Sequence, residues 1–431
     1  MLFSDITILD ETFAVREHMY VGVKGNTIAY VGTAEPKEDF GSVYSGKGRL
    51  LMPAFYNAHA HNAMTLLRGY AENMNLQDWL NTMIFPFEAK MKGEDIYAGT
   101  LLAMAESVRS GIVSSTDMYY WLDDIGRAVE TSGCKVNMSN AVTCFDGSSF
   151  EELPAYKIAC DAFQNWHGAA DGRILTDLSL HAEYTSTEKV ARGVAALAKE
   201  QGVRVHIHAS ETKSETDECV GRHGKTPVAY LADCGLLDVP ATLGHCVWIT
   251  DEDMDILGEK GATVAACPVS NSKLASGISN VPGLLEKGVR VALGTDGVSS
   301  NNSLNMLADA KVMALEARIK TGDPAVLTPQ QILYAMTRAG ALSQGREDCG
   351  LLKEGFKADL IVLDIDQPNM QPVHSLLNNL VWSADTGNIR LTMCDGQTLY
   401  KDGEYTTIDV EKAVAEANAA TKKILEKLSC S

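Results

Sequence analysis

The sequence lacks the features that would place it in a membrane or in an oxidising compartment. No hydrophobic run approaches the length of a bilayer span, no long hydrophobic stretch follows Met1, and no basic residue precedes Arg16. Its ten cysteines include no Cys-x-x-Cys pair, and a chain of this size needs no disulfides to fold. We therefore expect a cytoplasmic protein with reduced thiols and no membrane partner.

Positive charge is also scarce. Asp and Glu number 56 against 37 Lys and Arg, which leaves a net charge of −19. Nucleic-acid binding depends on basic side chains that neutralise phosphates, and binding to anionic membrane surfaces depends on them too. The composition therefore argues against both kinds of partner, and we interpret the excess negative charge as a source of solubility.

Eight short hydrophobic runs alternate with longer amphipathic segments over the middle of the chain. Such alternation, without repeats of the glycine-rich dinucleotide-binding motif, predicts a parallel sheet with helices outside it. Eight βα units over about 300 residues are typical of an α/β fold of the (β/α)8 TIM-barrel type. The runs are 50–58, 112–116, 135–142, 174–180, 203–207, 241–244, 263–266 and 289–293.

The two ends of the chain have a different pattern. Short strand-like segments with turns occupy residues 1–52, and such segments return after residue 342, before a final helix. Neither end has enough strands to bury a core alone. We expect residues 1–52 and 343–431 to form one composite β-sandwich domain that includes the C-terminal helix, beside a barrel of residues 53–342.

Ionisable residues gather at the ends of the predicted strands, where TIM barrels carry their chemistry. The first run ends in His59-Ala60-His61, and side chains two apart on a strand point to the same side. An isolated pair of this kind is more often a surface feature than a metal site. Other strands end in the same way, and this concentration favours a metal centre. The strand-end residues are His59, His61, His181, His208, His245 and Asp296.

Three histidines and one aspartate can hold a metal ion and leave room for water. We assign His59, His61, His208 and Asp296 as the ligands. Barrel hydrolases with two metals usually need a bridging group, often a lysine that ends strand four, and no lysine lies between residues 157 and 189. A single divalent ion is therefore expected, with Zn²⁺ favoured and Fe²⁺ or Mn²⁺ left open.

Several motifs resemble those of the amidohydrolase superfamily over nearly the whole chain. The closest likeness is to the 5′-methylthioadenosine/S-adenosylhomocysteine deaminases. The motifs are Pro53 with His59-Ala60-His61, then 64–69 (MTLLRG), 208–212 (HASET), 244–246 (GHC), 268–274 (PVSNSKL), 293–297 (LGTDG) and 299–302 (SSNN).

The resemblance implies a hydrolytic deaminase that acts on the 6-amino group of an adenosine-type nucleoside. A bound metal would lower the pKa of its water. Asp296 and His245 can accept protons as hydroxide forms, and the hydroxide attacks C6 of the base. Glu211 can protonate the adjacent ring nitrogen and help the amine leave as ammonia, which is general acid–base catalysis.

The same resemblance implies three further substrate contacts. Trp79 would pack near the ribose or the 5′ group, Glu88 would hydrogen-bond the ribose hydroxyls, and His181 would contact the base. Members that accept S-adenosylhomocysteine place arginines near the end of strand three. This chain has no arginine between Arg127 and Arg173, and a buried carboxylate without a cation is costly. We therefore expect 5′-methylthioadenosine, 5′-deoxyadenosine or adenosine in preference to S-adenosylhomocysteine.

Four questions stay open from the sequence. Another amidohydrolase, such as a guanine or pterin deaminase or a chlorotriazine-type hydrolase, would use the same metal site with a different pocket. A non-catalytic assembly protein on this fold is the alternative from a different class, and such proteins usually lose metal ligands. His206 alternates with hydrophobic neighbours inside a strand, so it either packs in the core or supports a ligand from behind. A homo-oligomer is possible.

Overall fold

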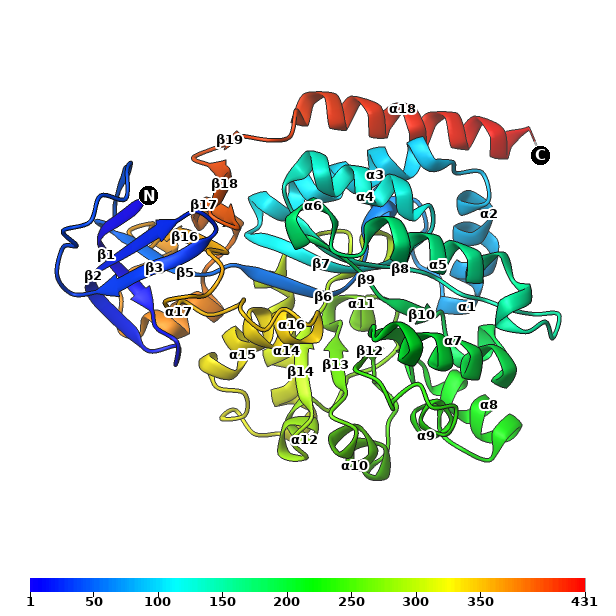
Figure 1. Ribbon diagram of the computed structural model, residues 1–431. Helices are drawn as coiled ribbons and strands as arrows, with labels where there is room; N and C mark the ends of the chain where they lie inside the picture. The colour runs from blue at the N-terminus through cyan, green and yellow to red at the C-terminus, as the bar shows by residue number, and fades with distance from the viewer. Residues whose placement is uncertain (431) are drawn as a thin grey trace.

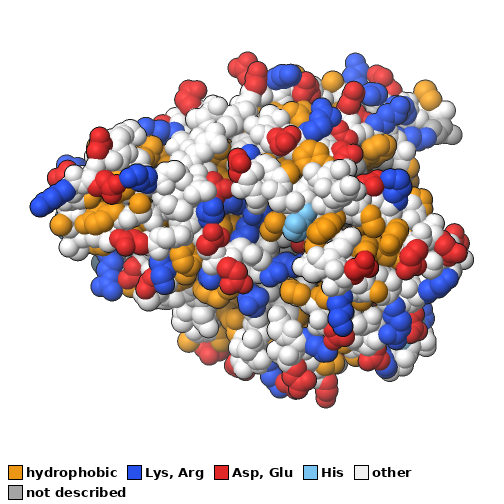
Figure 2. All heavy atoms as spheres, in the orientation of Figure 1, with side chains coloured by type: hydrophobic (Ala, Val, Ile, Leu, Met, Phe, Trp, Pro, Cys, Tyr) orange, Lys and Arg blue, Asp and Glu red, His pale blue; other side chains and the backbone are white. Residues whose placement is uncertain are grey.

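The protein consists of a small strand-rich unit, which holds the N-terminus, and a larger α/β unit beside it (Figure 1). The computed structural model describes residues 1–430. Among these residues no helix is long and apolar enough to cross a membrane, and all ten cysteines are free. On the face drawn in Figure 2, Lys and Arg side chains are interspersed with Asp and Glu, so opposite charges share the surface.

The larger unit is built on two parallel five-stranded sheets. Their inner strands are buried along their whole length, which explains the continuous hydrophobic character of the sequence runs. The strands are β6 Phe55–His61, β7 Ile112–Tyr119, β8 Lys135–Asn140, β9 Ile174–Thr176, β10 Leu178–Leu180, β11 Val205–Ala209, β12 Ala241–His245, β13 Thr263–Ala266, β14 Arg290–Leu293 and β15 Asp296–Gly297.

The fourth and eighth predicted strands are each divided between the two sheets. β9 pairs with β8 while β10 pairs with β11, and β14 pairs with β13 while β15 pairs with β6. At the first joint the amide of Asp177 donates to the carbonyl of Met138 at 3.0 Å, and a parallel bridge joins Val142 to Leu180. The two sheets together supply the eight strand positions that the sequence predicted for an α/β fold of the TIM-barrel type.

Helices cover the outside of these sheets (Figure 1). Several begin with a capping side chain and end at a left-handed glycine: in α7 the Thr187 hydroxyl accepts from the amide of Val190, and Gly202 has φ of 68°. The helices are α1 Leu76–Trp79, α2 Phe85–Glu88, α3 Gly93–Arg109, α4 Leu122–Ser132, α5 Pro154–Trp166, α6 Ala169–Gly172, α7 Glu188–Gln201, α8 Lys213–His223, α9 Pro227–Asp233, α10 Asp251–Glu259, α11 Pro268–Lys273, α12 Val281–Glu286, α13 Val298–Asn301, α14 Met306–Thr321, α15 Pro329–Met336, α16 Arg338–Ser343, α17 Leu376–Trp382 and α18 Val410–Ser429.

The two ends of the chain combine into one mixed sheet of nine strands, which confirms the predicted composite unit. β5 joins the halves, because it pairs with β1 in parallel and with β16 antiparallel. The sheet buries its own hydrophobic cluster, to which both ends contribute. Its strands are β1 Leu2–Leu9, β2 Val15–Lys24, β3 Thr27–Gly32, β4 Val43–Ser45, β5 Arg49–Pro53, β16 Leu360–Asp364, β17 Ile389–Cys394, β18 Gln397–Lys401 and β19 Glu404–Tyr405.

The composite sheet meets the barrel at the N-terminal end of β8. Lys135, the first residue of that strand, is buried with 3% exposure and pairs with Asp359 and Asp395. The C-terminal helix α18 lies along α3 of the barrel (Figure 1), where Lys423 approaches Asp95 at 3.8 Å. The domain boundaries at 52/53 and 342/343 stay a prediction.

Candidate metal centre and active site

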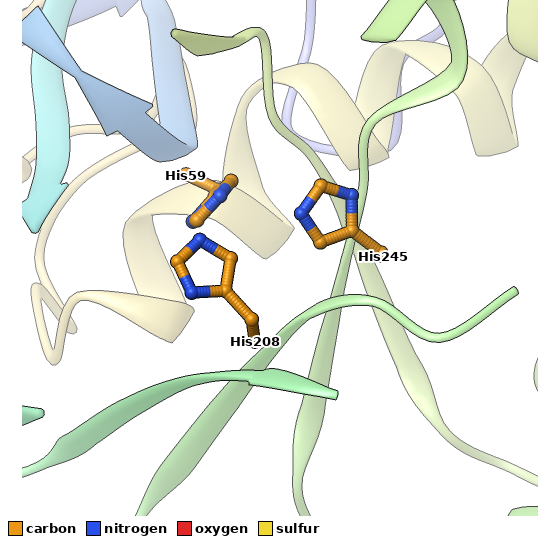
Figure 3. A group of neighbouring side chains, drawn as sticks. All are labelled: His59, His208 and His245. Carbon is orange, nitrogen blue, oxygen red and sulfur yellow. The ribbon is translucent and has the colours of Figure 1, made fainter. Parts of the chain in front are cut away.

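Four strands bring ionisable side chains to one point at the C-terminal end of the barrel. His59 and His61 come from β6, His208 from β11 and Asp296 from β15. His61 Nε2 lies 3.2 Å from His208 Nε2, and both His59 Nε2 and His61 Nε2 lie 3.3 Å from Asp296 Oδ1. His245, at the end of β12, points its ring at His59 and His208 (Figure 3).

These side chains form two overlapping groups that could each hold a metal ion. One group is His59, His208 and His245, and the other is His59, His61 and Asp296; within each group the possible ligand atoms lie within 4.8 Å of one another. Nitrogen and carboxylate donors at this spacing suit a divalent cation such as Zn²⁺. The structure therefore brings together every residue that the sequence predicted as a ligand.

The histidine rings are oriented by hydrogen bonds on their far side. His61 Nδ1 donates to the carbonyl of Met118 at 2.6 Å, and His208 Nδ1 donates to the carbonyl of His181 at 2.6 Å. His59 Nδ1 lies 2.6 Å from His206 Nε2. With Nδ1 engaged in this way, each ring directs its Nε2 at the centre, which is how protein metal sites orient imidazole ligands.

Asp296 is held in the same manner. Its Oδ2 accepts hydrogen bonds from the hydroxyls of Ser270 at 2.6 Å and Ser300 at 2.9 Å, so Oδ1 is left to face the histidines. Burial works to raise the pKa of this carboxyl, but the surrounding histidines hold it well below its ordinary range. Asp296 is therefore ionised, as a metal ligand must be.

His59 shows that the centre fits a cation. Its Nε2 is buried and lies 3.3 Å from Asp296 Oδ1, but it makes no aligned hydrogen bond within residues 1–430. A buried nitrogen left in this way is costly unless something binds it. Burial lowers the pKa of His59 to about 4 despite the opposing effect of Asp296. The ring is thus neutral near pH 7 and offers a lone pair where a metal ligand needs one.

Glu211 and His245 lie beside each other at the edge of this centre. His245 Nε2 lies 3.7 Å from Glu211 Oε2, and His245 Nδ1 donates to the Asn271 side-chain oxygen at 2.9 Å. Burial raises the pKa of Glu211, partly opposed by His245. For His245, burial works to lower the pKa, but the carboxylates of Glu211 and Asp296 raise it above its ordinary value.

A pocket opens above the metal centre and is lined by all the remaining predicted site residues, namely Trp79, Glu88, His181, Glu211 and His245. The Trp79 indole is 5% exposed, and its Nε1 has no partner in the described part of the chain. The Glu88 Oε1 accepts from the Tyr119 hydroxyl at 2.6 Å, and burial raises the pKa of Glu88 to about 7. Burial lowers the pKa of His181 to about 4.

The residues that hold the predicted ligands and pocket side chains in place were not identified from the sequence. Ser270, Asn271 and Ser300 lay in motifs that the sequence singled out without assigning roles. Tyr119 ends β7, and Glu215 on α8 accepts the backbone amides of Ser210 at 2.8 Å and Glu211 at 2.7 Å. The available signal was their position, because each lies at or just beyond the end of a barrel strand.

The fold and this cluster place the chain among α/β-barrel proteins with a histidine-rich metal site. Residues 50–399 match the amidohydrolase family, and the chain belongs to that family. It is 36% identical over 427 residues, 99% of both chains, to a 5-methylthioadenosine/S-adenosylhomocysteine deaminase of Dictyoglomus thermophilum. It is 39% identical over 389 residues, 90% of both chains, to a 5′-deoxyadenosine deaminase of Methanosarcina acetivorans.

A solved structure is similar over the whole chain. It is an adenosine deaminase of Xanthomonas campestris with bound zinc, which superposes with a TM-score of 0.93 at 30% identity and covers 99% of this chain and 98% of its own. The high TM-score over nearly the full length means that the barrel and the composite sheet have the same arrangement in both proteins.

Proposed function

We propose that this protein is a metal-dependent hydrolytic deaminase of adenosine-type nucleosides. It would replace the 6-amino group of 5′-methylthioadenosine, 5′-deoxyadenosine or adenosine with oxygen, and release ammonia. The observation that carries the proposal is the convergence of His59, His61, His208 and Asp296 beside the Glu211–His245 pair, at the floor of a pocket. The activities named for the 36% and 39% identical relatives support the choice of substrate.

His59, His61, His208 and Asp296 hold one divalent ion, with Zn²⁺ favoured and Fe²⁺ or Mn²⁺ as alternatives. The bound zinc of the Xanthomonas campestris enzyme supports that choice. When bound, such an ion supplies a water whose pKa is close to neutral. The four side chains need no rearrangement to receive it, because their donor atoms already face one another.

Glu211, His245 and Asp296 move the protons. Asp296 and His245 accept protons from the attacking water, and Glu211 donates to the ring nitrogen next to C6 and then to the departing amine. The raised pKa of Glu211 suits this role, since a buried carboxyl holds its proton closer to neutral pH. His245 Nε2 lies 3.7 Å from Glu211 Oε2, which is too long for a direct hydrogen bond in this arrangement. In the proposed cycle a proton taken from the water returns to Glu211 before the amine departs.

The pocket walls position the nucleoside. Glu88 accepts hydrogen bonds from the ribose hydroxyls, and its Tyr119 partner fixes the carboxylate. Trp79 packs against the ribose or 5′ group and has a free indole N–H to donate. His181 has its Nδ1 3.0 Å from the Thr185 hydroxyl, which leaves Nε2 for the base.

An ammonia-release screen tests the proposal. The metal-loaded protein is given adenosine, 5′-methylthioadenosine, 5′-deoxyadenosine, S-adenosylhomocysteine, guanine and cytosine. We expect turnover of the first three and weaker use of S-adenosylhomocysteine. Turnover of only the non-adenine compounds would instead support another amidohydrolase activity, and a metal-free protein with no turnover would support the assembly-protein alternative.

A further inference from the structure

A second cavity adjoins the catalytic pocket and shares three of its walls. It has a volume of about 620 Å³, and Phe85, Glu88 and Tyr120 line both spaces. We call it the acidic vestibule. Its other walls include Trp121, Asp123, Asp124, Asn140, Ile158 and Asp161. The vestibule meets the pocket at Glu88, the side chain assigned to the ribose hydroxyls, so in the proposed function a substituent of the ribose, such as the 5′ group, would extend into it.

The walls of the vestibule carry negative charge and no positive charge. Asp123, Asp124 and Asp161 line it together with Glu88, whereas no lysine or arginine does. Arg127 pairs with Asp124 at 2.8 Å, and Lys157 pairs with Asp161 at 2.5 Å. Each cation therefore offsets one carboxylate.

Asp123 pairs with no cation within residues 1–430. Its Oδ1 accepts a hydrogen bond from the indole N–H of Trp166 at 2.7 Å, which leaves the full negative charge in place. A neutral donor stabilises a carboxylate without cancelling its field. With three aspartates and two paired cations, the vestibule keeps an uncompensated charge before Glu88 is counted.

Aromatic rings complete the wall. Trp121 is 52% exposed and has a left-handed backbone with φ of 59°, at the residue just before α4. Tyr120 and Phe85 lie in the same wall. Exposed aromatic faces beside carboxylates attract cations, because the ring quadrupole and the negative charges act in the same direction.

Asn140 points to a ligand independently of the charges. It ends β8, is only 8% exposed, and lines the vestibule. Within residues 1–430 its side-chain amide makes no hydrogen bond, although the backbone carbonyl of the same residue accepts from Ser179. The residue lines a space large enough to hold a polar ligand group that could bond this amide. An amide can bond a polar group but supplies no charge to hold a carboxylate.

We propose that the acidic vestibule is a subsite for a positively charged 5′ substituent, such as an ammonium or a sulfonium, and that it selects against a carboxylate. This inference rests on the proposed nucleoside deamination. It goes beyond the preference for neutral 5′ groups that the sequence predicted. The missing arginines explain why a carboxylate would bind poorly, but they do not predict that a cation would bind well. The Asp123 carboxylate, the aromatic faces and the Asn140 amide supply the attraction.

Three matched substrates test the charge preference. They are adenosines with 5′-alkylthio chains of equal length that end in an ammonium, a methyl or a carboxylate group. We expect kcat/KM to rank ammonium above methyl above carboxylate, with roughly tenfold between the extremes and a smaller gap at high salt. Equal or better use of the carboxylate compound would overturn the inference and indicate that Arg127 and Lys157 turn into the cavity. Absence of turnover for all three compounds would instead overturn the proposed function, and the subsite with it.

A pair of variants locates the effect. Asp123→Asn should lower the ammonium-to-methyl ratio of kcat/KM by about threefold, the size expected of a partly exposed charge interaction. Asp255→Asn removes a carboxylate from α10, which lines neither cavity, and should leave the ratio unchanged. Turnover of the methyl compound checks that each variant is folded and active, because this substrate carries no charge that could interact with Asp123. An unchanged ratio in Asp123→Asn would contradict the role assigned to that carboxylate.

Discussion

Both ends of the barrel bury charged groups, but only at one end are those groups fully paired within the chain. At the N-terminal end of the strands, Lys135 is surrounded by acceptors from the composite sheet: Asp359 and Asp395 bind its ammonium, and Tyr56 also donates to Asp359. At the C-terminal end, the histidines and Asp296 converge, and His59 Nε2 makes no hydrogen bond in the described part of the chain. The first arrangement is complete within the chain, and the second is complete only with a cation.

This contrast separates stability from chemistry. A buried ion pair whose members satisfy each other holds two units together and has no bonding capacity left. A buried group with an orphaned atom is destabilising in isolation and marks a place where something binds. The same barrel therefore carries a structural contact at one end and a reaction centre at the other, as is usual for this fold.

Removing the Asp296 carboxylate should have the largest effect on metal binding and turnover at the C-terminal end of the barrel strands. Asp296→Asn keeps the shape of the side chain but loses the charge that faces His59 and His61. We expect loss of bound metal and a fall in kcat/KM of roughly 10⁴-fold or more, since water activation is lost with the ion. Metal analysis and ammonia release measure both effects. Asp238→Asn, at an exposed carboxylate paired with Lys260, is the control and should change neither.

Glu211→Gln should separate metal binding from proton transfer. The amide has nearly the same size but cannot donate an acid proton, so we expect normal metal content with kcat lowered by about 10²–10⁴-fold. Glu218→Gln, an exposed neighbour on α8, should retain full turnover. Near-normal turnover in Glu211→Gln would remove this residue from the acid–base role.

Lys135→Met tests the other end of the barrel. It leaves the Asp359 carboxylate buried without its cation, so we expect the free energy of unfolding to fall by about 3–5 kcal/mol. The metal content and kcat of the folded fraction should stay the same, because the change lies at the opposite end of the strands. Chemical denaturation measures the first and ammonia release the second. Lys287→Met, which removes an exposed partner of Asp255, is the control and should leave the denaturation midpoint nearly unchanged. A lower kcat with unchanged stability would contradict the division between the two ends.

His206→Phe tests how the metal ligands are oriented. It removes the Nε2 atom that His59 Nδ1 contacts at 2.6 Å, while the phenyl ring keeps most of the packing. We expect metal affinity to weaken by about 10- to 100-fold, as for other groups that orient metal ligands. Competition with a chelator measures this. His18→Phe, at an exposed histidine, is the control, and equal affinity in both variants would leave His206 as a packing residue.

The smallest effect concerns the pocket wall. Burial raises the pKa of Glu88 to about 7, partly opposed by the Tyr119 hydrogen bond. The ionised form accepts more hydrogen bonds from ribose hydroxyls than the protonated form, so KM should fall about threefold as pH rises from about 6 to about 8. Glu88→Gln should raise KM and remove this pH dependence while kcat changes little. A pH-dependent KM that survives the substitution would assign the titration to another group.

The barrel was predictable because each strand run is hydrophobic and ends at a chemically active residue. His59-Ala60-His61, His208 and Asp296 could be recognised from their positions at strand ends alone. The division of strands four and eight between two sheets was not predictable, since it depends on pairing at Asp177 and between β15 and β6, not on local hydrophobicity. The hydrogen-bonded supports of the ligands were missed for a similar reason. Ser270 and Ser300 are far apart along the chain and meet only at Asp296.

The role of His206 shows the limit most clearly. In the sequence it is one polar residue between Val205 and Ile207, and two interpretations were open. The structure places it 2.6 Å from His59, which supports the second interpretation, that of a residue behind a ligand. No local pattern carries that information, because His59 and His206 are separated by 147 positions.

The sequence by itself determined the family, the alternation of strands and helices, and the set of residues able to bind a metal and move protons. These follow from side-chain chemistry and local periodicity, which each segment carries with it. Only the tertiary structure decided which ring nitrogens face the centre and which buried atoms lack a hydrogen bond. It also decided that Asn140 and Asp123 line the same cavity. Those properties depend on distances between segments remote in sequence, and a distance exists only once the chain has folded.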